Sequence, residues 1–323
     1  MKNHVNRFIL TIIFLLVASC APFKPQERQS PEGELPQFFS LYTSESEPEA
    51  RWWEEFNDPD LNVLINEALS DNLTLKEAWS RLVQTRALAV QAGAALYPDL
   101  TGTAEAYYAR QRSDNGSRKT ISNEDYSLGV ISSYELDLWG RIQAGRESAL
   151  LEVTAAREDL NTAAMTLAAE VANRWVNIIS QRMQKRLLER QLQTNLTLLE
   201  LIELRFRMSM VSAVDVYQQK QIVEDIMAEI PLVEAEEQVL RHELALLLGK
   251  PPGTSLKISR EDFPEPTEIP ATGLPADLLS LRPDLRRAGM RLQAADWQVA
   301  AARANRLPAI RLTAGAQYGK GDM

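Results

Sequence analysis

Few residues in this chain could carry out chemistry. The 323 residues include a single cysteine, Cys20, and two histidines, His4 and His242. A zinc site needs about four nitrogen or sulfur ligands, or three plus water, and one cysteine cannot form a disulfide within the chain. The sequence has neither a glycine-rich phosphate loop nor a plausible Ser-His-Asp set. We therefore expect no enzyme: no catalytic residues, no metal and no cofactor.

The overall charge excludes another class of function. The formal net charge is -9 at pH 7, and hydrophobic residues make up 45% of the chain. This composition can build one large domain or two small ones. Nucleic-acid binding requires a positively charged surface, so we expect no nucleic-acid partner.

The chemistry that Cys20 can do is lipid attachment. Lys2 and Arg7 precede a nearly continuous apolar run from Phe8 to Ala18, as in a bacterial export signal. The stretch 16–20 (LVASC) resembles the lipobox, after which the cysteine is acylated and becomes the new N-terminus. An ordinary signal peptide with a chance cysteine is the alternative. We predict a signal peptide over 1–19 and a lipid-anchored tether over 20–50, because 21–50 is rich in Pro, Glu and Ser.

The residue after the cysteine bears on location. In bacterial lipoproteins an aspartate there commonly retains the protein in the inner membrane, and here the residue is Ala21. We therefore expect a protein anchored by lipid in the outer membrane and extending into the periplasm.

Two segments with different periods follow the tether. Apolar residues at steps of three and four predict a helix that begins near Asp60 and ends at Pro98. Residues 99–111 and 126–137 alternate instead, with a polar loop between them, which predicts two antiparallel strands of roughly 10–13 residues within 99–137. That length suits a tilted strand crossing a bilayer. The pattern alone fits a soluble hairpin with one buried face equally well.

A long helical hairpin is predicted over 140–249. From Arg141 to Phe206 there is no proline, and the only glycine lies near the start. An unbroken helix of this length would measure roughly 100 Å. Met208 to Ser212 is the predicted reversal, and a second helix continues from Ala213 to Leu248, before Gly249 and two prolines.

The C-terminal part repeats the beginning. Segment 78–108 is similar to 288–318 at an offset of 210, and Pro98 and Pro308 mark the same helix-Pro-strand junction. The expected organisation is a first repeat over 51–249, a Pro-rich linker or equatorial region over 250–277, and the start of a second repeat over 278–323. A fourth strand and a second long hairpin would complete the repeat, so we expect this chain to be a truncated copy.

Four motifs in order resemble those of one family. They are Trp52–Leu61 (WWEEFNDPDL), Ser133–Arg141 (SYELDLWGR), Ser212–Val216 (SAVDV) and Leu281–Arg286 (LRPDLR). Together with the lipobox, they resemble the TolC-like outer membrane factor family, in particular its NodT-type lipoprotein branch. The resemblance runs from Trp52 to the C-terminus.

The resemblance implies a fold and a function. The fold class is mainly α with membrane β-strands: long antiparallel helical hairpins form an α-barrel, and a β-hairpin contributes to the β-barrel of a homotrimer. The function is that of an outer-membrane channel subunit in a tripartite efflux or export system. Substrates such as drugs, metals or other small molecules would pass from an inner-membrane pump through a periplasmic adaptor and the channel.

Two groups of site residues are expected. The resemblance places adaptor docking at the hairpin tip, at Met208, Ser209, Met210, Val211, Ser212 and Asp215. Ser209 stands where the family usually has glycine, and it would be strained if the turn needs a positive φ. Asp215 could equally be an acid near a helix N-terminus. Glu105 and Tyr107 should face the channel lumen if Leu100 to Tyr108 faces lipid.

Two alternatives and one doubt about the pore accompany this interpretation. A periplasmic adaptor, or a structural coiled-coil lipoprotein, could also carry a lipid and a helical hairpin. Three protomers with three strands each would give nine strands, an odd number unlike typical bacterial barrels. We therefore expect that the 323-residue product alone is an incomplete, non-conducting fragment.

Overall fold

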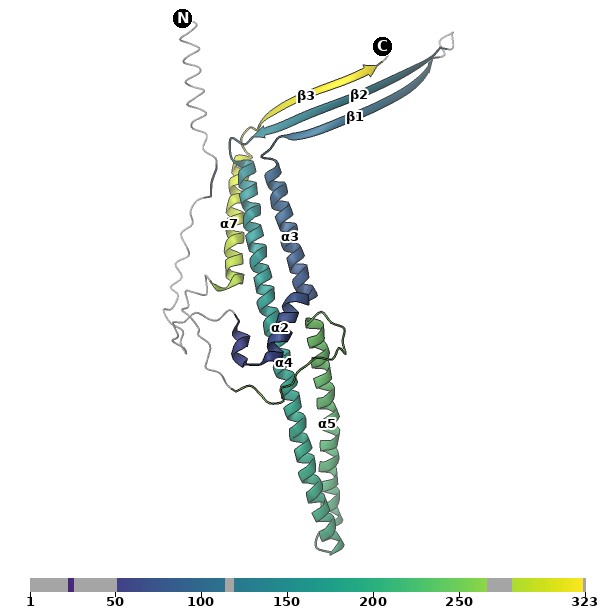
Figure 1. The fold of residues 1–323 in the computed structure, drawn as a ribbon, viewed down its shortest axis with the longest axis vertical. Helices are drawn as coiled ribbons and strands as arrows, with labels where there is room; N and C mark the ends of the chain where they lie inside the picture. Colours follow the sequence, from purple (N-terminus) through teal and green to yellow (C-terminus); the bar gives the residue numbers. More distant parts are fainter. Residues whose placement is uncertain (1–22, 26–50, 114–118, 266–280, 322–323) are drawn as a thin grey trace. The chain divides into compact units, whose positions relative to one another are not determined.

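The structure is a computed structural model that describes residues 23–25, 51–113, 119–265 and 281–321 (Figure 1). The chain forms two compact units, which are described separately. The first contains Arg81–Glu158 and Leu285–Met323, and the second contains Glu34–Ser80 and Asp159–Asp284. Cys20 and most of the predicted tether lie outside the described residues.

The predicted helix from Asp60 to Pro98 is interrupted. After the short 3-10 helix η1 (Trp52–Phe56) come α2 (Pro59–Asp71) and α3 (Leu73–Ala94). Asn72 ends α2 and begins α3: its Oδ1 accepts a hydrogen bond from the backbone N–H of Leu75 at 2.9 Å, and its Nδ2 donates to the Leu247 carbonyl at 2.9 Å. The expectation of one continuous helix was wrong, because the buried Asn72 side chain caps the start of α3 and binds the end of α5.

The long hairpin agrees with its prediction. Helix α4 spans Arg141–Arg207 and α5 spans Ala213–Leu247, with a five-residue reversal between them. Where α4 and α5 pair in the second unit, Gln219 is buried and its Nε2 donates to the Asn195 carbonyl oxygen at 3.2 Å and to Asn195 Oδ1 at 3.0 Å. A buried polar pair of this kind fixes the register of two packed helices.

The repeat at offset 210 is visible in the helix boundaries. Helix α7 spans Pro283–Ala304, and both of its ends lie 210 residues after those of α3. The turn that follows is also the same: Tyr97 donates its backbone N–H to Ala94, as Leu307 does to Ala304, at 3.0 Å each. A strand follows each helix. The backbone thus has the same order of helix, turn and strand at both places.

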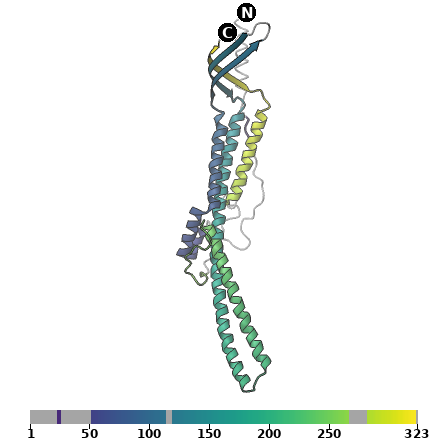
Figure 2. The same cartoon turned by 90° about the vertical axis from the view of Figure 1, so that its right-hand side faces the viewer.

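The three strands form one antiparallel sheet in the order β1-β2-β3 (Figures 1 and 2). Strand β1 spans Asp99–Ser113, β2 spans Lys119–Leu136 and β3 spans Ile310–Gly321. The strands of the first hairpin have 15 and 18 residues, longer than predicted. The apolar pattern underestimated them because ladder hydrogen bonds continue where side chains are polar.

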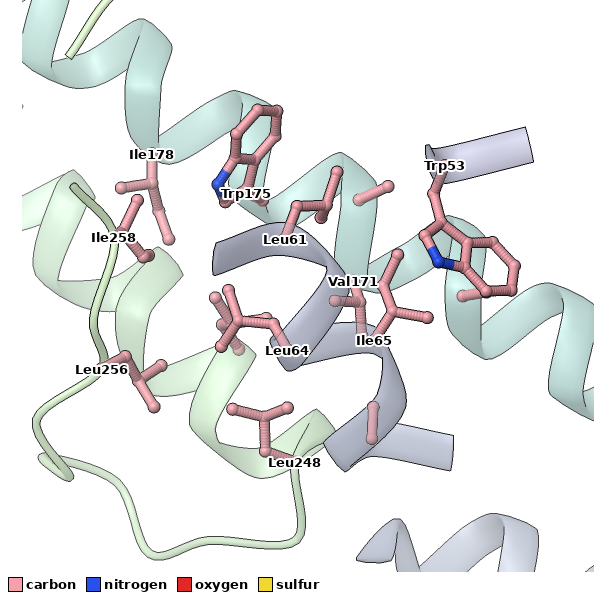
Figure 3. Packing of buried hydrophobic residues seen from close by; sticks show 14 of the residues in the cluster. Trp53, Leu61, Leu64, Ile65, Val171, Trp175, Ile178, Leu248, Leu256 and Ile258 are labelled. Atoms are coloured by element: carbon pink, nitrogen blue, oxygen red, sulfur yellow. The ribbon is translucent and has the colours of Figure 1, made fainter. Parts of the chain in front are cut away.

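The main hydrophobic core lies in the second unit and joins η1, α2, α4, α5 and the segment after α5 (Figure 3). Trp175 and Ile178 of α4 are fully buried, as are Leu61 and Ile65 of α2. Leu256 and Ile258, from the segment that follows α5, complete the cluster. These apolar residues recur at helical spacing, so each helix buries one face.

Arginine side chains attach the segment after α5 to this core. Arg182 donates to the carbonyl oxygens of Ile258 and Arg260 at 2.8 and 2.9 Å, and its Nε lies 3.0 Å from Glu237 Oε1. The backbone N–H of Ser259 donates to Asp60 at 2.9 Å. This bond, helped by Lys257, holds the pKa of the Asp60 carboxyl below its ordinary value.

Candidate functional site

The sheet in the first unit has one apolar face and one polar face. The register pairs Leu100 with Ser132 and Ala314, and Ala104 with Leu128 and Tyr318. Successive side chains of a strand point to opposite faces, so residues aligned in this way share a face. The apolar alternation of all three strands therefore falls on the same side of the sheet.

The side chains of this apolar face are exposed in the single chain. Leu100 is 70% exposed, Leu128 66% and Tyr318 79%. The other large apolar side chains of the face include Tyr108, Tyr126, Val130, Ile310 and Leu312. An exposed apolar surface of this extent marks contact with a membrane or a partner.

The opposite face carries Glu105 and Tyr107. Glu105 is aligned with Ser127 and Gly319, and Tyr107 with Asp125 and Gly321. Both side chains are exposed. Among the strand residues whose side chains are described, Ile131 also lies on this face, and the other large aliphatic side chains lie on the opposite one. Glu105 and Tyr107 thus belong to one polar surface of the sheet.

A charged cluster fixes the ends of the strands that join the helices. Glu135 of β2 accepts from Arg141 of α4 at 2.6 Å and from Arg311 of β3 at 3.1 Å. Trp139 donates its indole N–H to the Pro308 carbonyl at 2.9 Å. Asp137 accepts from the first backbone N–H groups of α4 and so caps that helix. The sequence motif 133–141 gave no sign of the partners across the sheet.

The hairpin tip is closed by a Schellman motif at the end of α4. Met210 N–H donates to the Arg205 carbonyl at 2.9 Å and Ser209 N–H to the Phe206 carbonyl at 2.8 Å. Ser209 has a φ of 58°, in the left-handed region. The backbone strain expected at Ser209 is confirmed, because this residue has a Cβ at a position where the turn favours glycine.

A capping box begins α5. The Ser212 hydroxyl accepts from the backbone N–H of Asp215, and the Asp215 carboxylate accepts from the backbone N–H of Ser212 at 2.8 Å. The Ser212 side chain and backbone both lower the pKa of the Asp215 carboxyl. Of the two roles considered for Asp215, the structure shows the helix-capping one.

The remaining tip residues present an apolar surface. Met208 is 59% exposed and Met210 71% exposed, and Val211, which follows Met210, is half-buried. A groove of about 320 Å³ runs between α4 and α5 behind the tip. The groove is lined by Glu203, Phe206, Arg207, Ala213, Val216, Tyr217 and Lys220. The ion pair of Lys220 with Glu203, at 3.0 Å, lies in this groove.

Two features are absent from the described residues. Within the described ranges, no three or more His, Cys, Asp and Glu side chains are arranged to hold a metal ion. In the part of the chain that the structure covers, no helix combines the length and the hydropathy needed to cross a membrane. Cys20, the predicted lipidation site, lies outside that part.

Comparison with known proteins places these features in a family. The profile of outer membrane efflux proteins matches residues 64–250, more than half of the chain. The pyoverdine export outer membrane protein OpmQ of Pseudomonas aeruginosa is 34% identical over 277 residues, which are 83% of this chain and 58% of OpmQ. Nodulation protein T of Rhizobium leguminosarum bv. viciae is 28% identical over 316 residues, which are 96% of this chain and 64% of that protein.

Solved structures of outer-membrane proteins have a fold similar to that of most of this chain. The outer-membrane channel OprN has a TM-score of 0.80 at 26% identity, with 93% of this chain and 72% of OprN covered. The outer membrane protein VceC of Vibrio cholerae has a TM-score of 0.73 at 26% identity, with 86% of this chain and 71% of VceC covered. The chain spans less than two thirds of the length of the curated relatives it matches. With the profile match, the two-faced sheet and the long helical hairpin, the chain belongs to the family of outer membrane efflux proteins.

Proposed function

We propose that this chain is a subunit of an outer-membrane channel through which an inner-membrane pump exports small molecules. The channel is a passive conduit, and a periplasmic adaptor joins it to the pump. The names of relatives such as OpmQ support export across the outer membrane. The observation that carries the proposal is the sheet, whose three strands align an apolar and a polar face. A coiled-coil lipoprotein with a purely structural role needs no such sheet.

In this proposal one face of the sheet contacts lipid and the other contacts water. The apolar face, with Leu100 and Leu128, contacts the hydrocarbon of the membrane. The polar face, with Glu105 and Tyr107, lines the lumen. Because the outer edges of β1 and β3 are unpaired within the described residues, they offer backbone hydrogen bonds to further strands. The fourth strand that the repeat predicts and the strands of neighbouring protomers in a homotrimer supply these partners, and the shared barrel places the polar faces inside.

The adaptor docks at the hairpin tip. The docking surface consists of Met208, Ser209, Met210, Val211, Ser212 and Asp215. The exposure of Met208 and Met210 supports this role, because flexible apolar side chains adapt to a partner surface. Asp215 acts indirectly, since its carboxylate is engaged in the capping box and orders the loop that presents the two methionines.

A lipid on Cys20 anchors the subunit in the outer membrane. The signal peptide over 1–19, the tether over 20–50, the first repeat over 51–249, the linker over 250–277 and the second repeat from 278 remain our proposed organisation. The exact offset of 210 between α3 and α7 supports the two-repeat division.

The membrane topology of the sheet tests the proposal. Adjacent residues of β2 provide a matched pair: Ser127→Cys on the polar face and Leu128→Cys on the apolar face. In outer-membrane fractions, a water-soluble, membrane-impermeant thiol reagent should label the cysteine at 127 and spare the one at 128. Equal labelling of both, or recovery of the chain outside the outer membrane, would contradict the proposal. The labelling does not depend on conductance by the isolated chain.

A further inference from the structure

The apolar face of the sheet carries charged side chains only at one end, among the residues whose side chains are described. Arg110 of β1, Glu124 of β2 and Lys320 of β3 share this face, because the register aligns Arg110 with Ser122, Glu124 with Tyr108, and Lys320 with Tyr126. All three are exposed. They lie toward the β1–β2 turn, whereas the opposite strand ends lead into the helices.

Tyrosines separate these charges from the aliphatic part of the face. Tyr108, Tyr126 and Tyr318 come from the three strands and are 61%, 57% and 79% exposed. They occupy the last rows before or beside the charged residues. Aromatic side chains in such a row are typical of the boundary between membrane hydrocarbon and headgroups.

The length of the apolar band fits this boundary. From the Leu136–Ile310 row to the Tyr126–Lys320 row is ten residues. Ten residues extend about 34 Å along a strand, and a tilt of about 40° turns this into about 26 Å of membrane thickness, close to the band of about 25 Å in outer-membrane barrels. Arg110 lies four residues beyond the last row, which is about 10 Å farther along the membrane normal at the same tilt. Lys320 and Arg110 thus bracket the headgroup layer.

We propose that Arg110 and Lys320 bind the phosphate groups of the phosphorylated glycolipid in the outer leaflet of the membrane. This inference rests on the proposed function: the strand ends that lead into the helices face the periplasm, so the end of the sheet that carries Arg110 and Lys320 lies on the outer side. A guanidinium donates paired hydrogen bonds to phosphate, and an ammonium adds a point charge. The Cα atoms of the two residues are about 17 Å apart, from four residues along the strands and two strand spacings across. Two separated cations suit a headgroup that carries two phosphates.

Removing the negative charge of Glu124 should have the opposite effect on lipid binding. It lies in the row next to that of Arg110, at the diagonal distance over which cross-strand side chains interact. Its carboxylate repels phosphate and competes for the Arg110 guanidinium. Binding should therefore weaken when either cation is removed, and strengthen when the carboxylate is removed.

Binding of the purified full chain to lipid vesicles tests these expected increases and decreases in affinity. The vesicles contain phosphatidylcholine with bisphosphorylated lipid A, with dephosphorylated lipid A, or with phosphatidylglycerol. Arg110→Gln combined with Lys320→Gln should bind the bisphosphorylated vesicles about tenfold more weakly, as expected for roughly fivefold or less per cation at a charged surface. Glu124→Gln should bind them several-fold more tightly. The exposed pair Arg190→Gln and Arg205→Gln on α4 removes the same charge and should leave binding unchanged.

Three results would overturn the proposal. They are equal binding with and without phosphate on lipid A, an equal loss in the α4 control pair, and weaker binding by Glu124→Gln. Equal binding to phosphatidylglycerol would replace the glycolipid by any anionic headgroup and overturn the stated source. Thiol labelling at positions 127 and 128 shows separately whether the membrane topology holds in each variant, so failure of the lipid site and failure of the proposed function are distinguishable.

Discussion

Replacing Ser209 with glycine is expected to stabilise the hairpin tip. Ser209 has a φ of 58° at the position after the last residues of α4. A residue with a Cβ costs about 1–2 kcal/mol in this conformation. Glycine removes that cost, but it also gives the unfolded chain more conformational entropy, which lowers the free energy of unfolding by about 0.4–1 kcal/mol. The net expected gain is about 1 kcal/mol, which corresponds to about a fivefold change in a local opening equilibrium.

Amide hydrogen exchange followed by mass spectrometry measures this gain where it arises. The N–H groups of Ser209 and Met210 donate to the carbonyls of Phe206 and Arg205, so they exchange only when the turn opens. In Ser209→Gly, peptides that cover 204–214 should exchange about fivefold more slowly. Peptides from the core around Trp175 should be unchanged, because they are not part of the turn.

Gly249 provides the matched control at the end of α5. It forms the same pair of hydrogen bonds, from Lys250 to Ala245 at 2.9 Å and from Gly249 to Leu246 at 3.0 Å, with a φ of 70°. A Cβ on this residue would lie 2.6 Å from the Asp71 carbonyl oxygen. Gly249→Ala should therefore destabilise by about 3 kcal/mol, from the backbone conformation and the overlap together. Unchanged or faster exchange at the tip of Ser209→Gly would refute this account of the turn.

Three further perturbations have clear expected outcomes. Ser212→Ala removes the N-cap of α5 and should speed exchange in its first turn about fivefold; no change would show that water replaces the cap. The pKa of Asp60 is lowered in the folded chain, so its stabilising effect is complete above the ordinary aspartate pKa and is lost as pH falls through the folded value. The amide of Ser259 should thus lose protection below about pH 4, and Asp60→Asn should remove this pH dependence without abolishing folding. Arg286 lies 2.6 Å from Glu158, whose side chain is 2% exposed. Arg286→Met should therefore lower the free energy of unfolding by about 2 kcal/mol, because it leaves a buried carboxylate without this partner. The double change Arg286→Met with Glu158→Met should recover most of this loss in thermal unfolding measurements.

The sequence predicted the long elements well because little interrupts them. No proline or central glycine breaks the stretch of α4, and the reversal predicted at Met208 to Ser212 lies between the ends of α4 and α5. The offset of 210 identified α7 and β3 through α3 and β1, since the same helix-Pro-strand junction recurs. Alternation of side chains also identified the face that carries Glu105 and Tyr107.

Features that depend on distant partners could not be predicted. At the break between α2 and α3, the Asn72 side chain donates to the Leu247 carbonyl, which lies 175 residues away. Glu135 is one of two acidic residues in its motif, and nothing in the motif indicates that β3 brings Arg311 beside it. The charged side chains at one end of the apolar face are recognised only once the register of the three strands is known, because neither Arg110 nor Lys320 stands out in its own segment.

The central position of β2 has a consequence for the order of folding. Its partners in β3 lie between 174 and 196 residues later in the chain, whereas β1 ends at Ser113, shortly before β2 begins at Lys119. At about 5–20 residues per second, synthesis of the intervening chain takes roughly 10–40 s. During this time the second edge of β2 stays open and could recruit the wrong strand. Nascent chains therefore need protection for tens of seconds, and any slowing of translation between the two repeats lengthens that interval.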